Sequence, residues 1–467
     1  ETFTPLREMD FVAFTLQYEM SFTNILNMLD LAGIPLYAAD RDDNDPLIIA
    51  GGPTASNPEV LAPFIDFFYI GEGEVSYHEI FNRYEAHKAA GGHRRDFLSK
   101  ILDLGPIYVP AYYDVEYYDT PAAGAQYTPS IRSIRPNRPD APAKIRKDIV
   151  TDLETSFYPL KPIVPYLQTV HDRAVMEIFR GCIHGCRFCQ AGQVYKPVRY
   201  RSKETVMAMC EELMKNTGYD EISFTSLSTD DYPWLEELMT EFHEKFPNIA
   251  ISLPSLRVDA FSLGLMEKLA EGKKSGLTFA AEAGTQRLRD VINKGLTEEE
   301  ILNGCQLAFS GGWDRVKLYF MLGLPTETPE DIDGIAKFGY KILDTWNSIP
   351  KEQRSRDVQI TISTSFFVPK PFTPFQWAQM NTRDEFLEKA HIVRDAVKSQ
   401  LNQKSIKYNW HEADVTILEG VLARGDRKVA KVIKKAYEKG CLFDSWTEGF
   451  KNELWMEAFA ECGVDID

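Results

Sequence analysis

The feature that most constrains the fold is a regular alternation of apolar strand-like segments and amphipathic helical segments, which begins at residue 174. Strands joined by helices of ten or more residues lie parallel in a sheet. Six such units are fewer than the eight that close a β/α barrel, so the pattern predicts a partial (β/α)6 barrel with its functional residues at the carboxyl ends of the strands. The predicted strands are residues 174–180, 221–227, 249–255, 276–284, 315–323 and 358–367. The predicted helices between them include 203–217, with Ser202 as its N-cap, and 261–271.

The first hundred residues repeat this α/β character on a smaller scale. A helix is expected over residues 21–33, with Ser21 as its N-cap and Gly33 as its stop. The pattern predicts a Rossmann-like module with a parallel sheet. Three strands are few for an open sheet, so we expect further sequence upstream of Glu1. The predicted strands are residues 10–17, 46–52 and 64–74.

We therefore expect an α/β protein with four regions. The stretch between the two α/β parts is rich in aromatic residues, proline and basic residues, which favours an extended connector with one hairpin. The last stretch has helical apolar spacing. The predicted regions are a truncated Rossmann-like module (1–105), the connector (106–170), the partial barrel (171–378) and a helical C-terminal region (379–467).

Composition excludes several classes of protein. The net charge of −17 argues against a broad non-specific nucleic-acid surface, although a local basic groove is compatible with it. There is no run of 18 apolar residues, so no membrane span is expected. Seven unevenly placed cysteines do not form a secreted disulfide framework, which favours a reducing cytoplasm.

Three cysteines are crowded into one glycine-flanked loop after the first barrel strand. Cys182, Cys186 and Cys189 have the spacing C-x3-C-x2-C. Thiolates are ligands for zinc, copper or iron–sulfur clusters, and a structural zinc site needs four ligands. His184 is the one candidate inside the loop for a fourth ligand, but its place between two cysteines makes closure around one ion awkward.

The other cysteines do not complete the set. Cys210 and Cys305 occupy apolar positions of predicted helices, where a cysteine serves as a small core residue. Three thiolates would hold three corners of a cubane cluster and leave one iron open to a substrate or cofactor. Gly181 and Gly185 allow the tight backbone path of the loop.

With this loop at the end of the first of six β/α units, the sequence resembles the radical S-adenosylmethionine (SAM) superfamily. The resemblance implies a [4Fe-4S] cluster held by Cys182, Cys186 and Cys189. It also implies that SAM chelates the open iron and that one electron cleaves it to methionine and a 5′-deoxyadenosyl radical. An electron donor such as flavodoxin or ferredoxin is implied as a partner.

The same resemblance assigns SAM contacts to the other strand ends. Ser226 and Ser228 would bind the methionine amino group, with helix capping by Ser228 or Thr229 as the alternative. Phe188 would pack on a planar ligand or be a core aromatic. The remaining assignments are Arg257 for the SAM carboxylate, Glu282 and Gly284 near the ribose, and Gly323 near the adenine.

Nearly the whole chain resembles the uncharacterised bacterial radical SAM proteins that carry an N-terminal cobalamin-binding-like domain. Two of three cobalamin signatures have candidates, Thr15 in "FTLQ" and the pair Gly51 and Gly52 in "IAGGP". The third, D-x-H-x-x-G, is missing. The alternative is that these glycines simply turn the chain at strand ends.

Three functions remain open from the sequence. The first is cobalamin-dependent methylation of an unactivated carbon. The second is a cobalamin-independent radical modification of RNA or protein, although the lack of a second cysteine triad counts against methylthio transfer. The third is a non-catalytic iron–sulfur module that binds RNA, which the basic aromatic stretch 194–203 keeps open. The sequence identifies neither the substrate nor a catalytic acid or base.

Overall fold

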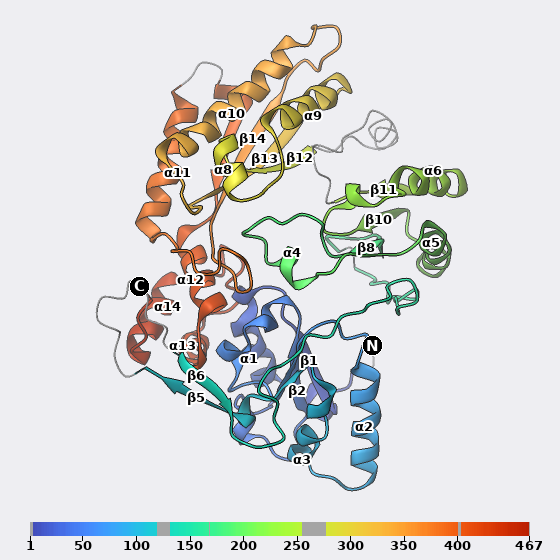
Figure 1. Cartoon of the computed structure of the whole chain (residues 1–467), viewed down its shortest axis with the longest axis vertical. Coiled ribbons are helices and arrows are strands. Elements are labelled where there is room, and N and C mark those ends of the chain that lie inside the picture. The colour runs from blue at the N-terminus through green and yellow to red at the C-terminus, as the bar shows by residue number, and fades with distance from the viewer. Residues whose placement is uncertain (1–2, 119–130, 168, 255–276, 400–402, 467) are drawn as a thin grey trace. The chain divides into compact units, whose positions relative to one another are not determined.

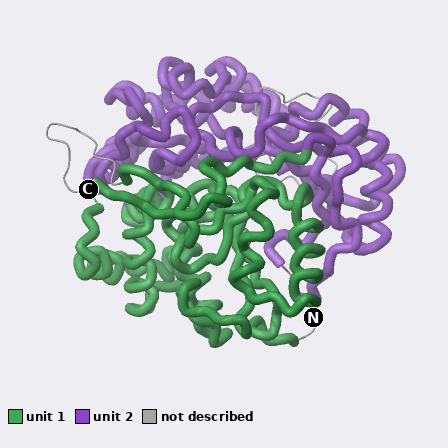
Figure 2. Tube along the Cα trace, turned by 60° about the horizontal axis from the view of Figure 1, so that its bottom comes forward, with its two compact units in different colours: residues 1–150, 414–467 green, residues 151–413 purple. Residues whose placement is uncertain are grey.

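The computed structural model describes residues 3–118, 131–167, 169–254, 277–399 and 403–466. The chain folds into two compact units, which Figure 2 distinguishes by colour. Figure 1 labels the helices and strands along the chain. Unit 1 combines residues 1–150 with residues 414–467, and unit 2 is residues 151–413. The compact units therefore divide the chain at different positions from the four predicted regions.

Unit 1 is built on a four-stranded sheet. Its first three strands are parallel neighbours in chain order, as predicted, and the fourth is antiparallel to the third. Fully buried runs such as Leu47–Gly51 fit a sheet that is covered on both faces. The strands are β1 (Phe11–Thr15), β2 (Leu47–Gly51), β3 (Phe67–Tyr69) and β4 (Ile107–Tyr108).

The first helix of unit 1, α1 (Phe22–Leu31), begins and ends where the sequence predicts. Gly33 follows it with φ +67°, a conformation that favours glycine. Ser21 occupies the N-cap position but does not cap the helix with its side chain. Its hydroxyl donates to the carbonyl of Tyr18 in the preceding 3-10 turn.

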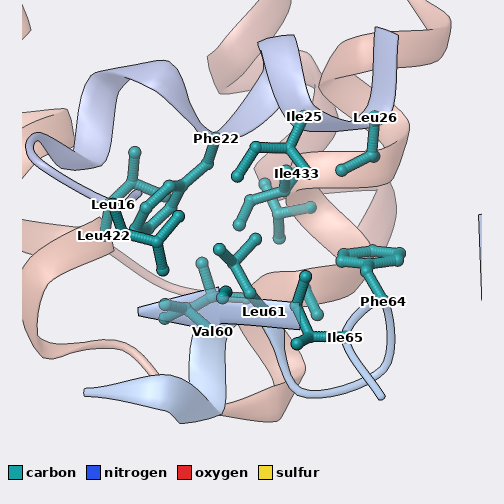
Figure 3. Packing of buried hydrophobic residues seen from close by; sticks show 14 of the residues in the cluster. Leu16, Phe22, Ile25, Leu26, Val60, Leu61, Phe64, Ile65, Leu422 and Ile433 are labelled. Atoms are coloured by element: carbon teal, nitrogen blue, oxygen red, sulfur yellow. The ribbon is translucent and has the colours of Figure 1, made fainter. Parts of the chain in front are cut away.

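The C-terminal helices complete the core of unit 1. Leu422 and Ile433 lie against residues of the N-terminal sheet and helix, as Figure 3 shows. Arg427 fixes this packing, since it donates to Glu59 and to the hydroxyl of Tyr108. These helices are α12 (Ala413–Arg424), α13 (Arg427–Glu438) and α14 (Asn452–Cys462).

The predicted hairpin of the connector is present in unit 1. Strands β5 (Tyr113–Tyr117) and β6 (Ile131–Pro136) pair antiparallel. Helices α2 (Tyr77–Ala89) and α3 (Arg94–Ser99) lie between β3 and β4 in the chain.

Unit 2 contains all six predicted barrel strands in two parallel sheets. One sheet has the order β11-β10-β7, and the other has the order β12-β13-β14-β15. The break between them coincides with residues 255–276, which are outside the described part. The strands are β7 (Ala174–Glu177), β10 (Glu221–Thr225), β11 (Ala250–Ser252), β12 (Leu277–Glu282), β13 (Arg315–Leu322), β14 (Gln359–Phe366) and β15 (Ile406–Trp410). The described residues form no closed barrel, and the (β/α)6 arrangement itself stays a prediction.

Helices connect the strands of unit 2. The helix predicted over 203–217 is α5 (Lys203–Thr217), and Ser202 caps it as expected by accepting from the amide of Thr205. The region 379–467 is mostly helical, as predicted, and it also contains strand β15, a short segment that adds to the edge of β14. The helix predicted over 261–271 lies outside the described residues. The other helices are α6 (Leu235–Lys245), α8 (Gln286–Val291), α9 (Glu298–Ser310), α10 (Pro329–Ser348) and α11 (Arg383–Lys398).

Candidate functional site

The cysteine loop lies at the carboxyl end of β7. After β7 a short hairpin of β8 (Phe179–Arg180) and β9 (Arg199–Tyr200) encloses the loop, and α4 (Ala191–Val194) follows the last cysteine. Gly181 has φ +93°, and a Cβ there would lie 2.7 Å from the carbonyl oxygen of Pro197. Glycine is therefore required at the start of the loop, as the sequence predicts.

The three cysteines of the loop share one environment. Cys182, Cys186 and Cys189 are half-buried, and no described cysteine forms a disulfide. In the described residues no three His, Cys, Asp or Glu side chains converge on one metal position. The amide of Gly192 donates to Cys189 Sγ at 3.3 Å. The binding of a cluster by these thiols stays a prediction.

The predicted core role of Cys210 and Cys305 is confirmed. Both side chains are fully buried among apolar residues. Burial raises the pKa of Cys210 to about 12 and raises the pKa of Cys305 as well. These thiols stay protonated near neutral pH, as expected of small core residues.

The carboxyl end of β10 lies against the cysteine loop. His184 Nε2 is 2.8 Å from Asp231 Oδ2, in the turn that follows β10. Ser226 Oγ accepts from the amide of Ser228 and lies 3.2 Å from Thr229 Oγ1. Ser226 is therefore already committed to the local turn.

Ser228 behaves differently from Ser226. Its side chain is 2% exposed, it caps no helix, and its hydroxyl has no hydrogen-bond partner among the described residues. A buried polar atom without a partner costs free energy, on the order of 1–3 kcal/mol. The Ser228 hydroxyl therefore fits a position that a bound ligand satisfies. The alternative of helix capping by this residue is not what the structure shows.

The end of β12 presents a carboxylate in an unusual backbone conformation. Glu282 has φ +65°, at an irregularity in the pairing of β12 with β13. A side chain in this region is strained, and such strain concentrates at functional sites. Lys294 Nζ lies 3.1 Å from Glu282 Oε1, and both side chains are largely buried.

The two glycines predicted near SAM have packing reasons of their own. A Cβ on Gly284 would lie 2.4 Å from main-chain atoms at Asp331 and Ile335, so this glycine lets the strand end approach α10. Gly323 has φ +82°, and its amide donates to the buried carboxylate of Glu327. Their predicted SAM contacts stay predictions.

Phe188 is partly buried and packs against a small apolar cluster. The cluster includes Leu288 of α8 and Phe367 after β14. This packing agrees with the core role that the sequence left open for Phe188, and its predicted contact with a planar ligand stays a prediction. Arg257, the predicted partner of the SAM carboxylate, lies outside the described residues.

In unit 1 the predicted cobalamin residues do meet at one edge of the sheet. Thr15 and Gly51 are paired residues of β1 and β2. Gly52 has φ +98°, and the main chain of Leu16 packs directly against it. A Cβ on Gly52 would lie 2.9 Å from the carbonyl oxygen of Leu16. The space that these glycines provide is thus used by the protein's own backbone.

Sequence reasoning missed two residues that hold the cysteine loop. Asn293 Nδ2 donates to the carbonyl of Gly185 at 3.0 Å, and the amide of Arg187 donates to the carbonyl of Ile292 at 2.9 Å. The Asn-Lys-Gly sequence after α8 is a typical helix-ending signal and gave no sign of this contact.

Family models match both α/β parts of the chain. The model of the radical SAM superfamily matches residues 176–339, from β7 into α10. The chain therefore contains a radical SAM domain. A model of the N-terminal part of radical SAM proteins matches residues 1–110. The radical SAM domain thus contains the cysteine loop, Ser228 and Glu282.

Alignments with similar proteins extend over most of the chain. The uncharacterized protein MJ0966 of Methanocaldococcus jannaschii is 26% identical, over 99% of the chain and 88% of that protein. A protein of Pyrococcus horikoshii named uncharacterized methyltransferase PH0819 is 21% identical, over 82% of the chain and 76% of that protein. The solved structure of the radical SAM methyltransferase TsrM of Kitasatospora setae, with cobalamin and a [4Fe-4S] cluster bound, has a TM-score of 0.45 and 14% identity. That match covers 79% of the chain and 66% of TsrM.

The part of the chain that the structure describes has no helix long and apolar enough to cross a membrane.

Proposed function

We propose that the chain is a radical SAM enzyme in which Cys182, Cys186 and Cys189 hold a [4Fe-4S] cluster and SAM binds at the open iron. The observation that carries the proposal is the position of the three cysteines. They lie on one loop after the first strand of the segment that matches the superfamily model. When bound, the cluster supplies the electron that cleaves SAM reductively.

The chain's own residues would bind and orient SAM. The Ser228 hydroxyl, buried and without a partner among the described residues, would accept a hydrogen bond from the amino group of SAM. Glu282, held by Lys294, would accept hydrogen bonds from ribose hydroxyls. The Gly192 amide would keep its hydrogen bond to Cys189 Sγ. An electron donor such as flavodoxin or ferredoxin would meet this site in the cytoplasm.

For the reaction itself we propose methyl transfer, with unit 1 binding cobalamin and SAM as the methyl source. The name of the Pyrococcus relative supports a methyltransferase. The glycines of unit 1 add little support, because backbone atoms fill their open sides. The alternative is a cobalamin-independent modification of RNA or protein by the same radical chemistry.

The test uses the full chain, reconstituted with iron and sulfide without oxygen. We expect reduced protein to release 5′-deoxyadenosine from SAM and a SAM-dependent change in the electron paramagnetic resonance of the cluster. Cobalamin that stays with the protein through gel filtration would support methyl transfer. A cluster that forms but shows no spectral response to SAM would contradict the radical SAM enzyme, and an apo-like protein after reconstitution would contradict the cluster.

A further inference from the structure

The segment that ends α8 contacts two parts of the candidate site at once. Asn293 reaches the cysteine loop through its side-chain amide, and its neighbour Lys294 reaches Glu282 at the end of β12. Two adjacent residues of one turn thus contact the loop proposed to hold the cluster and the carboxylate proposed to face the ribose.

The contacts to the cysteine loop come from main chain and side chain together. The amide of Arg187 donates to the carbonyl of Ile292 at 2.9 Å, and the Arg187 guanidinium donates to the carbonyl of Val291. From the other direction, Asn293 Nδ2 donates to the carbonyl of Gly185. Ile292 is fully buried in the apolar cluster into which Phe188 packs. The loop is therefore docked on this turn by the residues on both sides of its second cysteine, Cys186.

The backbone of the turn explains why these residue types occupy it. Asn293 has φ +54°, and asparagine tolerates this left-handed conformation better than other residues with a side-chain amide or an apolar side chain. The turn directs Asn293 to the loop while Lys294 reaches the carboxylate of Glu282. Glu282 itself is strained at φ +65°, so a fixed cation beside it helps to hold that geometry.

We propose that residues 291–294 form a clamp that sets the position of the cysteine loop relative to Glu282, with Asn293 and Lys294 as positioning residues. This inference rests on the proposed function for its meaning, since the clamp would align the cluster with SAM. Its structural part concerns contacts that are present without any cofactor.

The first experiment therefore uses the apo full chain and amide hydrogen exchange. Asn293→Gly keeps the left-handed backbone and removes the amide that bonds to Gly185. We expect exchange in residues 182–190 to become about fivefold faster. Asn216→Ala, which removes an exposed amide contact to the carbonyl of Leu160 elsewhere in unit 2, is the control and should leave the loop unchanged. Unchanged exchange in Asn293→Gly overturns the clamp.

The second experiment tests Lys294 in the reconstituted protein, by SAM affinity from the cluster spectrum. Lys294→Met should bind the normal amount of iron and lose about tenfold in SAM affinity. Lys294→Arg, which keeps a cation beside Glu282, should restore most of it. Lys341→Met, which breaks an exposed ion pair with Glu298, is the control.

A double variant shows whether Lys294 acts through Glu282. Lys294→Met combined with Glu282→Gln should bind SAM no more weakly than Glu282→Gln alone, whereas additive losses overturn the positioning role. If the wild-type chain forms no cluster on reconstitution, the proposed function is contradicted. The hydrogen exchange of the apo protein would still show whether residues 291–294 act as a clamp.

Discussion

Both units carry predicted site residues at the carboxyl ends of parallel strands, but the two sheet edges differ in what surrounds those residues. In unit 1 the open side of Gly52 is filled by the main chain of Leu16, and Gly51 packs beside Tyr69. In unit 2 one loop gathers three thiols, and Ser228 buries a hydroxyl without a partner among the described residues. Packing explains why unit 1 has glycines at its sheet edge. It does not explain why unit 2 has three thiols and a buried hydroxyl at its edge.

The comparison shows how differently two kinds of motif should be weighted. A glycine pair at a strand end is needed whenever two strand ends approach closely, whatever the protein binds. A buried hydroxyl without a partner, such as that of Ser228, costs stability unless a ligand or a water compensates. The edge of unit 2 is therefore the stronger candidate for a cofactor site.

The largest expected effect separates the thiols of the loop from those of the core. Cys182→Ala, Cys186→Ala or Cys189→Ala should each abolish nearly all cluster iron, because a cubane with two protein thiolates is not retained. Iron and sulfide content after reconstitution measures this. Cys210→Ala and Cys305→Ala are the controls and should keep the cluster, so iron loss in either control would break the comparison.

The largely buried ion pair of Arg427 with Glu59 should contribute to the stability of unit 1. Arg427→Met leaves Glu59 buried without its cation, and we expect a loss of about 3 kcal/mol in the free energy of unfolding. Urea unfolding followed by circular dichroism measures it. Lys431→Met, at an exposed position of the same helix, should change stability by less than about 0.5 kcal/mol. Equal effects of the two variants would contradict the proposed importance of the Glu59 contact.

Gly52→Ala tests whether packing explains the glycines of unit 1. The new methyl would meet the main chain of Leu16 at a φ of +98°, so we expect unfolding to become easier by about 2–3 kcal/mol. Gly91→Ala is the matched control, since its φ is +71° and no atom lies within 4 Å of the new methyl. It should cost about 1 kcal/mol. Similar losses would show that backbone strain, and not close packing, requires Gly52.

The smallest effect concerns a buried carboxyl group in unit 1. Burial raises the pKa of Asp444, despite hydrogen bonds from Trp455 and Thr23. A group with a raised folded pKa stabilises the fold fully below its unfolded pKa of about 3.9, and this contribution is lost as pH rises through the folded pKa. Asp444→Asn should therefore gain stability relative to wild type as the pH rises above about 3.9 and through the raised folded pKa of Asp444. A constant difference across that range would contradict the raised pKa.

Much of the fold was predictable because it rests on local signals. The apolar periodicity predicted the six strands of unit 2, and the Ser202 cap predicted the start of α5 at Lys203. Strand β15 was missed because its five residues lie in a stretch with helical spacing, and only pairing with β14 makes them a strand. The apolar stripe of α13 predicted a buried face, but it did not indicate that this face covers the N-terminal sheet.

The residues of the candidate site also differ in whether the sequence alone indicates them. The spacing of Cys182, Cys186 and Cys189 is a short-range pattern, and the sequence shows it directly. The contact between Asn293 and Gly185 joins residues 108 positions apart, and no local property of either residue indicates it. Ser228 and Ser226 differ only in their partners, so the sequence could not rank one above the other.

The assembly of unit 1 from both ends of the chain has a consequence for biosynthesis. On the ribosome the N-terminal sheet is made first, but Leu422, Ile433 and Trp455 enter its core only after all of unit 2 has been translated. Since domains fold as they emerge, unit 2 has its complete sequence while unit 1 still exposes apolar surface. The apolar surface of the first strands therefore stays exposed on the nascent chain until the C-terminal helices have been translated. During that time a chaperone or another transient contact would have to bind it.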